Sequence, residues 1–196
     1  MDNSTTIGQG DALVLVDVQN DFLPGGALGV PQGDEVIEVL NQYIALFRSR
    51  DLPIIATRDW HPADHCSFRE RGGPWPAHCV QGSQGAEFAP GLELPERVPV
   101  VSKADSPEQE DYSCFSNTDL HKRLKTLGVK RLFCGGLATD YCVLQTVTDA
   151  LGLGYEVVLL EDAIRAVNVN PGDGTAAVQK MRRKGAQPIQ CGQLAA

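Results

Sequence analysis

The sequence predicts a three-layer α/β/α fold built on a mainly parallel six-stranded sheet of Rossmann-like type. Short apolar segments of β type alternate with stretches whose apolar residues recur at helical spacing, which is typical of parallel sheets with helices on both faces. The first of these segments, 12–18, is apolar nearly throughout, as in a strand that is buried on both faces.

The predicted strands, in chain order, cover residues 12–18, 54–57, 98–102, 130–134, 156–160 and 187–190. The predicted helices cover residues 33–50, 120–127, 139–151 and 174–184. The helix at 139–151 follows the pair Gly135-Gly136 and has Thr139 or Asp140 as its expected N-cap.

At 196 residues, the chain is long enough for one domain with a substantial core. We therefore expect a single domain over 1–196, interrupted by a long loop at 59–95 that is rich in Gly, Pro, His and Trp. Loops of this length are usually functional.

The composition argues against several classes of partner. The net charge of -8 disfavours nucleic acid and anionic membranes, which attract positively charged proteins. The segment 1–10 is polar, unlike a signal peptide, and no stretch approaches the length of an apolar membrane span. With six cysteines that show no CxxC spacing, we expect reduced thiols and a cytoplasmic protein. The sequence leaves open whether the chain forms a homo-oligomer.

Three reactive side chains follow three predicted strands. Asp17, Lys103 and Cys142 lie far apart in the chain. The predicted sheet gathers them at one edge, beyond the carboxyl ends of its strands, where ligands of such sheets bind. Cys142 falls in the first turn of a predicted helix, where the helix dipole and a nearby lysine lower a thiol pKa. A carboxylate there could accept the thiol proton. The alternative is that the cysteine is a core residue and the aspartate a helix cap.

The long loop carries a group of metal-ligand side chains. Asp59 and His61 directly follow a predicted strand, and His65 and His78 come later in the same loop. Carboxylate and imidazole ligands suit Zn, Fe, Mn or Co. The alternative is a polar loop of hydrogen-bonded histidines. We interpret the neighbouring Cys66 and Cys79 as packing residues, and Phe22 and Trp75 either as core or as walls for a flat ring.

Five motifs in order make the chain resemble a known family over nearly its whole length. They are DVQNDFLPGG from Asp17, TRDWHP from Thr57, WPAHCV from Trp75, Ser102-Lys103 with Asp111-Tyr112-Ser113, and GGLATDYCV from Gly135. In this order they resemble the nicotinamidase/pyrazinamidase branch of the isochorismatase-like cysteine hydrolases.

The resemblance implies a metal-dependent amidohydrolase that converts nicotinamide to nicotinic acid and ammonia through a cysteine thioester in NAD salvage, and also deamidates pyrazinamide. It implies catalytic roles for Asp17, Lys103 and Cys142, and an oxyanion site formed by the N–H groups of Ala138 and Cys142 beside a cis Leu137–Ala138 peptide. One divalent metal, zinc first with iron or manganese as alternatives, is expected on Asp59, His61, His65 and His78. Substrate contacts are expected from Phe22, Trp75, Tyr112 and Leu137.

Two positions depart from the family pattern. Ala104 follows the lysine where glycine is common, which could alter the backbone near Lys103, and Cys114 stands where alanine is common. Two rival functions remain: another amidohydrolase, such as a ureidoacrylate or maleamate hydrolase, and a non-enzymatic metal- or ligand-binding protein with the same sheet.

Overall fold

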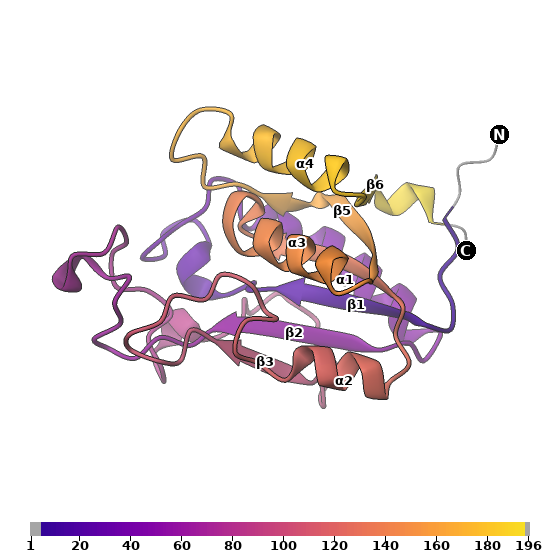
Figure 1. Cartoon of the computed structure of the whole chain (residues 1–196), viewed down its shortest axis with the longest axis horizontal. Helices are drawn as coiled ribbons and strands as arrows, with labels where there is room; N and C mark the ends of the chain where they lie inside the picture. The colour runs from indigo at the N-terminus through magenta and orange to yellow at the C-terminus, as the bar shows by residue number, and fades with distance from the viewer. Residues whose placement is uncertain (1–4, 195–196) are drawn as a thin grey trace.

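The computed structural model describes residues 5–194 of the chain, so residues 1–4 and 195–196 of the expected domain lie outside the described residues (Figure 1). Its strands are β1 (Asp11–Val16), β2 (Ile54–Asp59), β3 (Val100–Lys103), β4 (Arg131–Leu137), β5 (Glu156–Arg165) and β6 (Gln187–Ile189). Its α-helices are α1 (Glu35–Arg48), α2 (Leu120–Thr126), α3 (Leu144–Gly152) and α4 (Asp173–Arg183).

The six strands form one sheet in the order β3-β2-β1-β4-β5-β6. Every neighbouring pair is parallel, which confirms the predicted fold class. The chain moves outward from β1 to β3 and then returns to the other side of β1 to build β4, β5 and β6. The strand order therefore reverses between β1 and β4, and in sheets of this kind that is where a ligand-binding crevice opens at the carboxyl ends.

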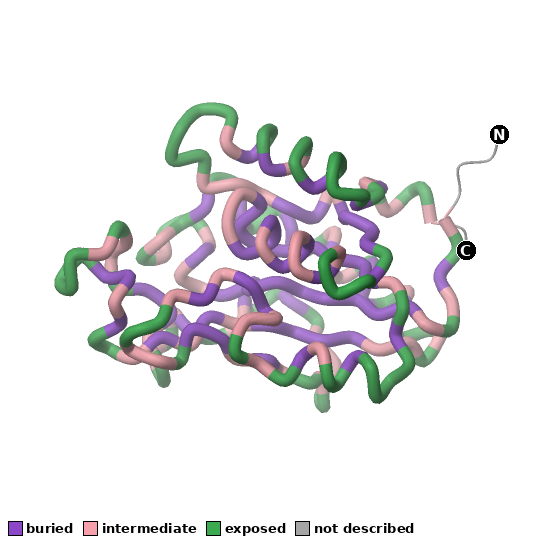
Figure 2. The backbone as a smooth tube through the Cα atoms, in the orientation of Figure 1, coloured by how far each residue is buried: buried purple, intermediate pink, exposed green. Residues whose placement is uncertain are grey.

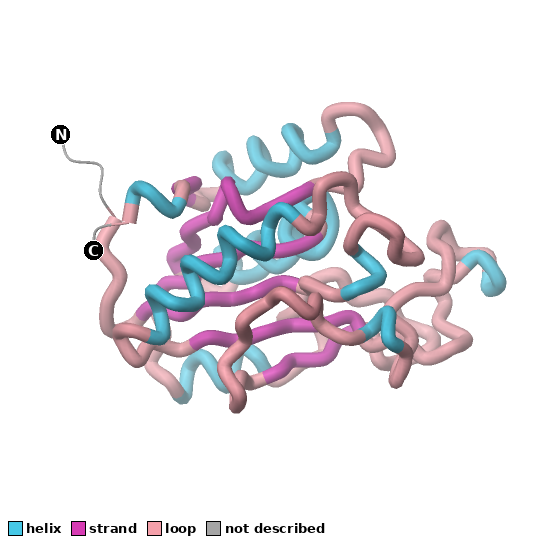
Figure 3. Tube along the Cα trace, turned by 180° about the vertical axis from the view of Figure 1, so that it is seen from behind, coloured by secondary structure: helices cyan, strands magenta, loops and turns pink. Residues whose placement is uncertain are grey.

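Helices cover both faces of the sheet, with α1 on one face and α2, α3 and α4 on the other (Figures 1 and 3). The side chains of β1 alternate between the two cores, because successive residues of a strand point to opposite faces. Leu13 and Leu15 pack with α1, whereas Val14 and Val16 pack with the other helices. The sheet is consequently the most buried part of the molecule (Figure 2).

Helix α1 shows how the sequence pattern produces this packing. Val36, Leu40, Ile44 and Phe47 recur at helical spacing and are all buried, forming the apolar stripe of an amphipathic helix. Glu35 and Glu38 stand in the first turn, where negative charge interacts favourably with the helix dipole.

The start of the predicted helix 139–151 differs from the expectation. A π-helical turn, η4 (Thr139–Val143), precedes α3, and its N-cap is Ala138 without a side-chain capping bond. The expected cap at Thr139 or Asp140 is therefore wrong. The Asp140 carboxylate instead accepts backbone N–H groups from Val167 and Asn168, which a local capping rule cannot anticipate.

Strand β4 also runs further than predicted, through both glycines of the Gly135-Gly136 pair to Leu137. Gly136 has a φ of 123°, and a Cβ atom there would lie 2.1 Å from the backbone oxygen of Val16. Only glycine permits this close approach of β4 to β1.

The loop after β2 contains the short 3-10 helices η2 (Arg69–Arg71) and η3 (Gln84–Ala86). Single β-bridges join His61 to Val80 and Phe68 to Trp75, so the loop folds back on itself at the carboxyl end of the sheet. Between residues 5 and 194, no helix is long and apolar enough to cross a membrane.

Candidate active site

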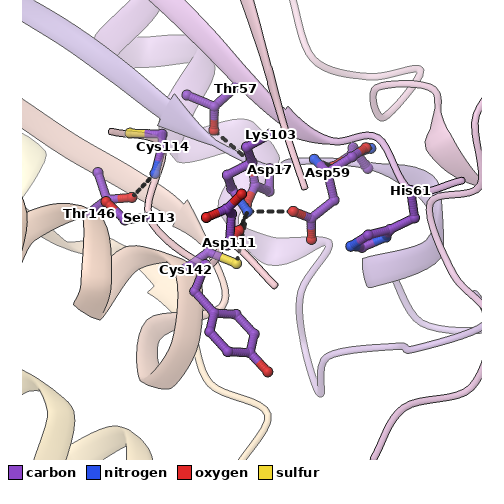
Figure 4. A network of polar contacts seen from close by, with 12 residues as sticks. Asp17, Thr57, Asp59, His61, Lys103, Asp111, Ser113, Cys114, Cys142 and Thr146 are labelled. Atoms are coloured by element: carbon purple, nitrogen blue, oxygen red, sulfur yellow. Dashed lines mark hydrogen bonds and ion pairs between the residues drawn. The ribbon is translucent and has the colours of Figure 1, made fainter. Parts of the chain in front are cut away.

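The structure brings Asp17, Lys103 and Cys142 together at the carboxyl edge of the sheet (Figure 4). Asp17 directly follows β1, Lys103 is the last residue of β3, and Cys142 lies in η4 after β4. The Lys103 Nζ lies 2.9 Å from the Asp17 Oδ2 and 3.4 Å from the Cys142 Sγ. It also pairs with the Asp59 carboxylate. One buried ammonium thus joins the thiol to two carboxylates.

Burial and charge shift the pKa values of this cluster in different directions. Burial opposes the charge of Lys103, but the neighbouring carboxylates outweigh it and raise the pKa of Lys103 well above its usual value. Burial raises the pKa of Asp17, although Lys103 and a 2.6 Å hydrogen bond from the Thr57 hydroxyl partly offset the rise. The lysine is therefore held as a cation.

The sequence predicted a lowered thiol pKa, but the opposite holds for Cys142. Its side chain is only 4% exposed, and burial raises its pKa well above the usual value despite the opposing charge of Lys103. The thiol is therefore protonated at neutral pH. A carboxylate oxygen of Asp17 lies within 4.8 Å of the sulfur, and this carboxylate is able to accept the thiol proton.

A second cluster adjoins the first and has the chemistry of a metal site. Asp59, His61 and His78 each offer a ligand atom, and these atoms lie within 4.8 Å of one another. The Nδ1 atoms of His61 and His78 contact backbone oxygens at 3.0 and 2.8 Å. Such outer contacts commonly orient metal-binding imidazoles. The buried Nε2 of His61 has no hydrogen-bond partner within residues 5–194.

This donor set fits a divalent metal. Burial lowers the pKa of His61 to about 4, so its imidazole is neutral at neutral pH, as a ligand must be. An unpartnered buried nitrogen is costly, and a metal ion would satisfy it. The carboxylate of Asp59 belongs to both clusters, because it lies beside His61 and also pairs with Lys103.

His65 lies beside this group, but its nitrogens have other partners. Its ring centroid is 4.3 Å from that of His61. Its Nδ1 is 2.8 Å from the Ser67 hydroxyl, and its Nε2 is 3.0 Å from the Gln109 carbonyl oxygen. The structure therefore does not bring His65 into the set of three, and its role as a ligand stays a prediction.

Cys142 of the first cluster lines a small cavity together with Asp59 and His78 of the second. Its lining residues are Phe22, Leu28, Asp59, Trp75, His78, Glu110, Tyr112, Ala138, Tyr141, Cys142 and Val167. Phe22, Trp75 and Tyr112 were predicted to contact the substrate, and all three line the cavity. Leu137 does not, because its side chain is fully buried in the core on the α1 side.

Four lining residues were not predicted: Leu28, Glu110, Tyr141 and Val167. Tyr141 directly precedes Cys142 in the sequence, and this adjacency could have identified it as a lining residue. Its ring packs at 5.0 Å from Trp75 and 5.5 Å from Tyr112, and the Trp75 Nε1 donates a hydrogen bond of 3.0 Å to the Tyr112 hydroxyl. Three aromatic rings from three segments thus form one wall.

The backbone around the cavity matches one expectation and, at Ala104, differs from another. The Leu137–Ala138 peptide is cis, as the resemblance implied. Ala104 has a φ of 53°, a left-handed conformation that glycine adopts without strain, so the alanine preserves the glycine-like geometry beside Lys103. Cys114 is fully buried in the core, where burial raises its pKa to about 12, and no reactive group is lost at either position.

The chain belongs to the isochorismatase family, because the model of the isochorismatase domain matches residues 11–193. Among its relatives, a nicotinamidase of Escherichia coli (strain K12) is 41% identical over 196 residues, covering 89% of this chain and 92% of the relative.

Solved structures agree with this assignment. The pyrazinamidase of Pyrococcus horikoshii in complex with zinc has a TM-score of 0.89 at 50% identity, covering 92% of this chain and 99% of that chain. PnC1 from L. infantum in complex with nicotinate has a TM-score of 0.90 at 37% identity, covering 98% of this chain and 99% of that one.

Proposed function

We propose that this protein is a metal-dependent cysteine amidohydrolase that converts nicotinamide to nicotinic acid and ammonia. The observation that carries the proposal is the cavity lined by Cys142 together with Asp59 and His78, two of the three clustered metal-ligand residues. A thiol, a proton acceptor and a metal-ligand set therefore lie close together, as cleavage of an amide on a metal-anchored ring requires. The nicotinamidase relative and the nicotinate-bound structure support this choice of substrate.

In the proposed first step, the Cys142 thiol gives its proton to the Asp17 carboxylate, and the thiolate attacks the amide carbon. Lys103 stays protonated and stabilises the Asp17 carboxylate before the transfer and the thiolate after it, since its Nζ lies 2.9 Å from Asp17 and 3.4 Å from the sulfur. The N–H groups of Ala138 and Cys142 stabilise the oxyanion, each by about 3–4 kcal/mol.

In the second half of the reaction, Asp17 returns the proton to the departing nitrogen, and ammonia leaves with a thioester on Cys142. Asp17 then accepts a proton from water, and the hydroxide attacks the thioester. The C–S bond breaks, the acid leaves, and Asp17 returns the proton to the Cys142 thiolate. Each proton therefore passes through the same carboxylate. Lys103 contacts that carboxylate throughout and keeps it aligned with the sulfur.

Asp59, His61 and His78 would hold the metal, with His65 as a further ligand only if it gives up its contact with Gln109 or Ser67. A bound divalent ion would supply a positive anchor for the ring nitrogen and, as a secondary role, could lower the pKa of a water molecule. We propose zinc as the metal, with iron or manganese as alternatives, because the Pyrococcus horikoshii relative was solved with zinc and these ligand types suit all three.

Phe22 and Trp75 would hold the ring, with Tyr112 hydrogen-bonded behind Trp75. Pyrazinamide has a similar ring with the same amide, so we propose that it is hydrolysed too. The product acid would enter NAD salvage.

The test is an ammonia-release assay with the purified protein, run before chelation, after chelation and after return of each metal in turn. We expect nicotinamide to release ammonia, the activity to disappear with the metal, and zinc to restore it. A panel containing a ureidoacrylate and a maleamate separates the rival amidohydrolases. Release of ammonia from either of these compounds but not from nicotinamide would refute nicotinamide as the substrate. If no amide releases ammonia, the protein is not an amidohydrolase, and the non-enzymatic binding protein is the reading that remains.

A further inference from the structure

The connection between β5 and α4, residues 166–172, forms part of the wall of the active-site cavity. Val167 lines that cavity together with Cys142. The connection lies at the same end of the sheet as the start of α3 (Figure 1). Asn168 holds a left-handed φ of 54°, and its side-chain oxygen accepts the backbone N–H of Gly174 at 2.9 Å. The segment is thus tied to the first turn of α4.

The carboxylate of Asp140, which lies in η4 together with Cys142, binds the same segment from the other side. The Asp140 Oδ1 accepts the N–H of Val167 at 3.0 Å, and its Oδ2 accepts the N–H of Asn168 at 2.8 Å. Hydrogen bonds to an ionised acceptor are about twice as strong as neutral ones. Asp140 stands two residues before Cys142, so this pair of bonds sets the distance between the nucleophile and the Val167 wall.

The two walls that Asp140 connects belong to different cores. Val167 packs against the core on the α1 side, which contains Phe22, whereas Cys142 and Tyr141 belong to the core on the opposite side of the sheet. The hydrogen bonds of Asp140 therefore join lining residues that pack in two different cores. Residues of both walls line one small cavity, so a displacement of one wall changes the space left for the ring of a substrate.

We propose that Asp140 is a positioning residue, whose carboxylate holds Val167 at a fixed separation from Cys142 and thereby sets the affinity for the ring of the substrate. This inference rests on the proposed function and adds to it a specificity determinant outside the catalytic group. Asp140 does not line the cavity, so it acts on the substrate through the segments that it joins and not by direct contact.

A double-mutant cycle tests this route. Asp140→Asn replaces one acceptor oxygen with an NH2 group that cannot accept an N–H, and Val167→Ala removes the wall on which Asp140 is proposed to act. The matched control is Asp173→Asn, because the Asp173 carboxylate accepts the N–H of Asn170 at 2.8 Å in the same connection but, among the described residues, accepts no hydrogen bond from η4. KM and kcat for nicotinamide are measured for each variant, together with metal content and melting temperature.

We expect Asp140→Asn to raise KM at least about fivefold with kcat changed by less than about twofold, as loss of uniform binding predicts. In the Val167→Ala background the same substitution should change KM by less than about twofold, because coupled residues are not additive. Asp173→Asn should leave KM unchanged in both backgrounds. An equal fold-change from Asp140→Asn in both backgrounds, or no change in either, would overturn the proposal.

Two further results keep the test decisive. If Asp140→Asn does not fold, Val167→Ala alone must raise KM for nicotinamide and must increase the turnover of a ring-methylated nicotinamide relative to nicotinamide. An unchanged KM for Val167→Ala then refutes the inference. If the wild-type protein releases no ammonia from nicotinamide, the proposed function has failed. If the wild type turns over nicotinamide normally but the effects of Asp140→Asn and Val167→Ala on KM are additive, only the proposed role of Asp140 is refuted.

Discussion

Replacing Lys103 with methionine should destabilise the metal-free protein strongly. The lysine side chain is 0% exposed, and its two partners, Asp17 and Asp59, are 0% and 7% exposed. Methionine fills a similar volume but leaves two buried carboxylates with no cation between them. Desolvated charges without a partner are among the costliest defects in a protein interior.

The size of the effect follows from this burial. Breaking a buried ion pair by removing one partner costs about 3–5 kcal/mol. For a chain of this length each kcal/mol lowers the melting temperature by about 2–4 °C, so we expect a loss of roughly 6–20 °C. Arg123→Met is the matched control, because Arg123 pairs with Asp119 at the surface with side chains 42% and 55% exposed. That pair is worth about 0–1 kcal/mol.

The assay is thermal unfolding of chelated protein, followed by circular dichroism, with urea unfolding to obtain the free energy. Lys103→Met should melt far below both the wild type and Arg123→Met. If Lys103→Met melts within about 2 °C of the Arg123→Met control, the cluster is not the buried, charge-balanced unit described above, and the reasoning fails.

Three other variants test separate parts of the site. Cys142→Ala should lower nicotinamide turnover at least about a thousandfold, as loss of a nucleophile does, while metal content by elemental analysis stays near wild type; appreciable ammonia release would rule out covalent catalysis. His61→Ala removes one of three clustered ligand groups, so it should lose metal in a chelator competition. It should also lose the rise in melting temperature that added metal gives the wild type. Unchanged metal affinity would place the ion elsewhere. Ala104→Gly should be at least as stable as the wild type in urea, since relief of about 1–2 kcal/mol of left-handed strain offsets the flexibility of glycine. The control Ala176→Gly, in the exposed part of α4, should lose about 1 kcal/mol of stability. Equal losses of stability in both variants would contradict a strained backbone at Ala104.

The alternation of apolar segments was sufficient to predict the sheet, because parallel strands buried on both faces have a distinctive composition. Asp17, Lys103 and Cys142 could be expected to meet, since each follows a strand and the carboxyl ends of parallel strands share one edge. The motifs then added the cis peptide and the metal-ligand set, which strand periodicity alone does not reveal.

Tertiary packing decided the rest. Val167 and Leu28 line the cavity because of how their connections fold over it, and an apolar residue in a connection has no pattern that marks it. The pKa of Cys142 rises instead of falling because its burial outweighs the charge of Lys103, and burial of that degree depends on the assembled loops. His65 satisfies both ring nitrogens with Ser67 and Gln109, which spacing in the sequence cannot show.

The most direct test of the account is to trap the acyl-enzyme. Wild-type protein loaded with metal is mixed with nicotinamide, quenched in acid within one turnover, and examined by intact-protein and peptide mass spectrometry. We predict a mass increase equal to one nicotinoyl group on the peptide that contains Cys142, and no adduct in Cys142→Ala. Rapid release of ammonia with no adduct on any cysteine, together with full activity in Cys142→Ala, would contradict the account.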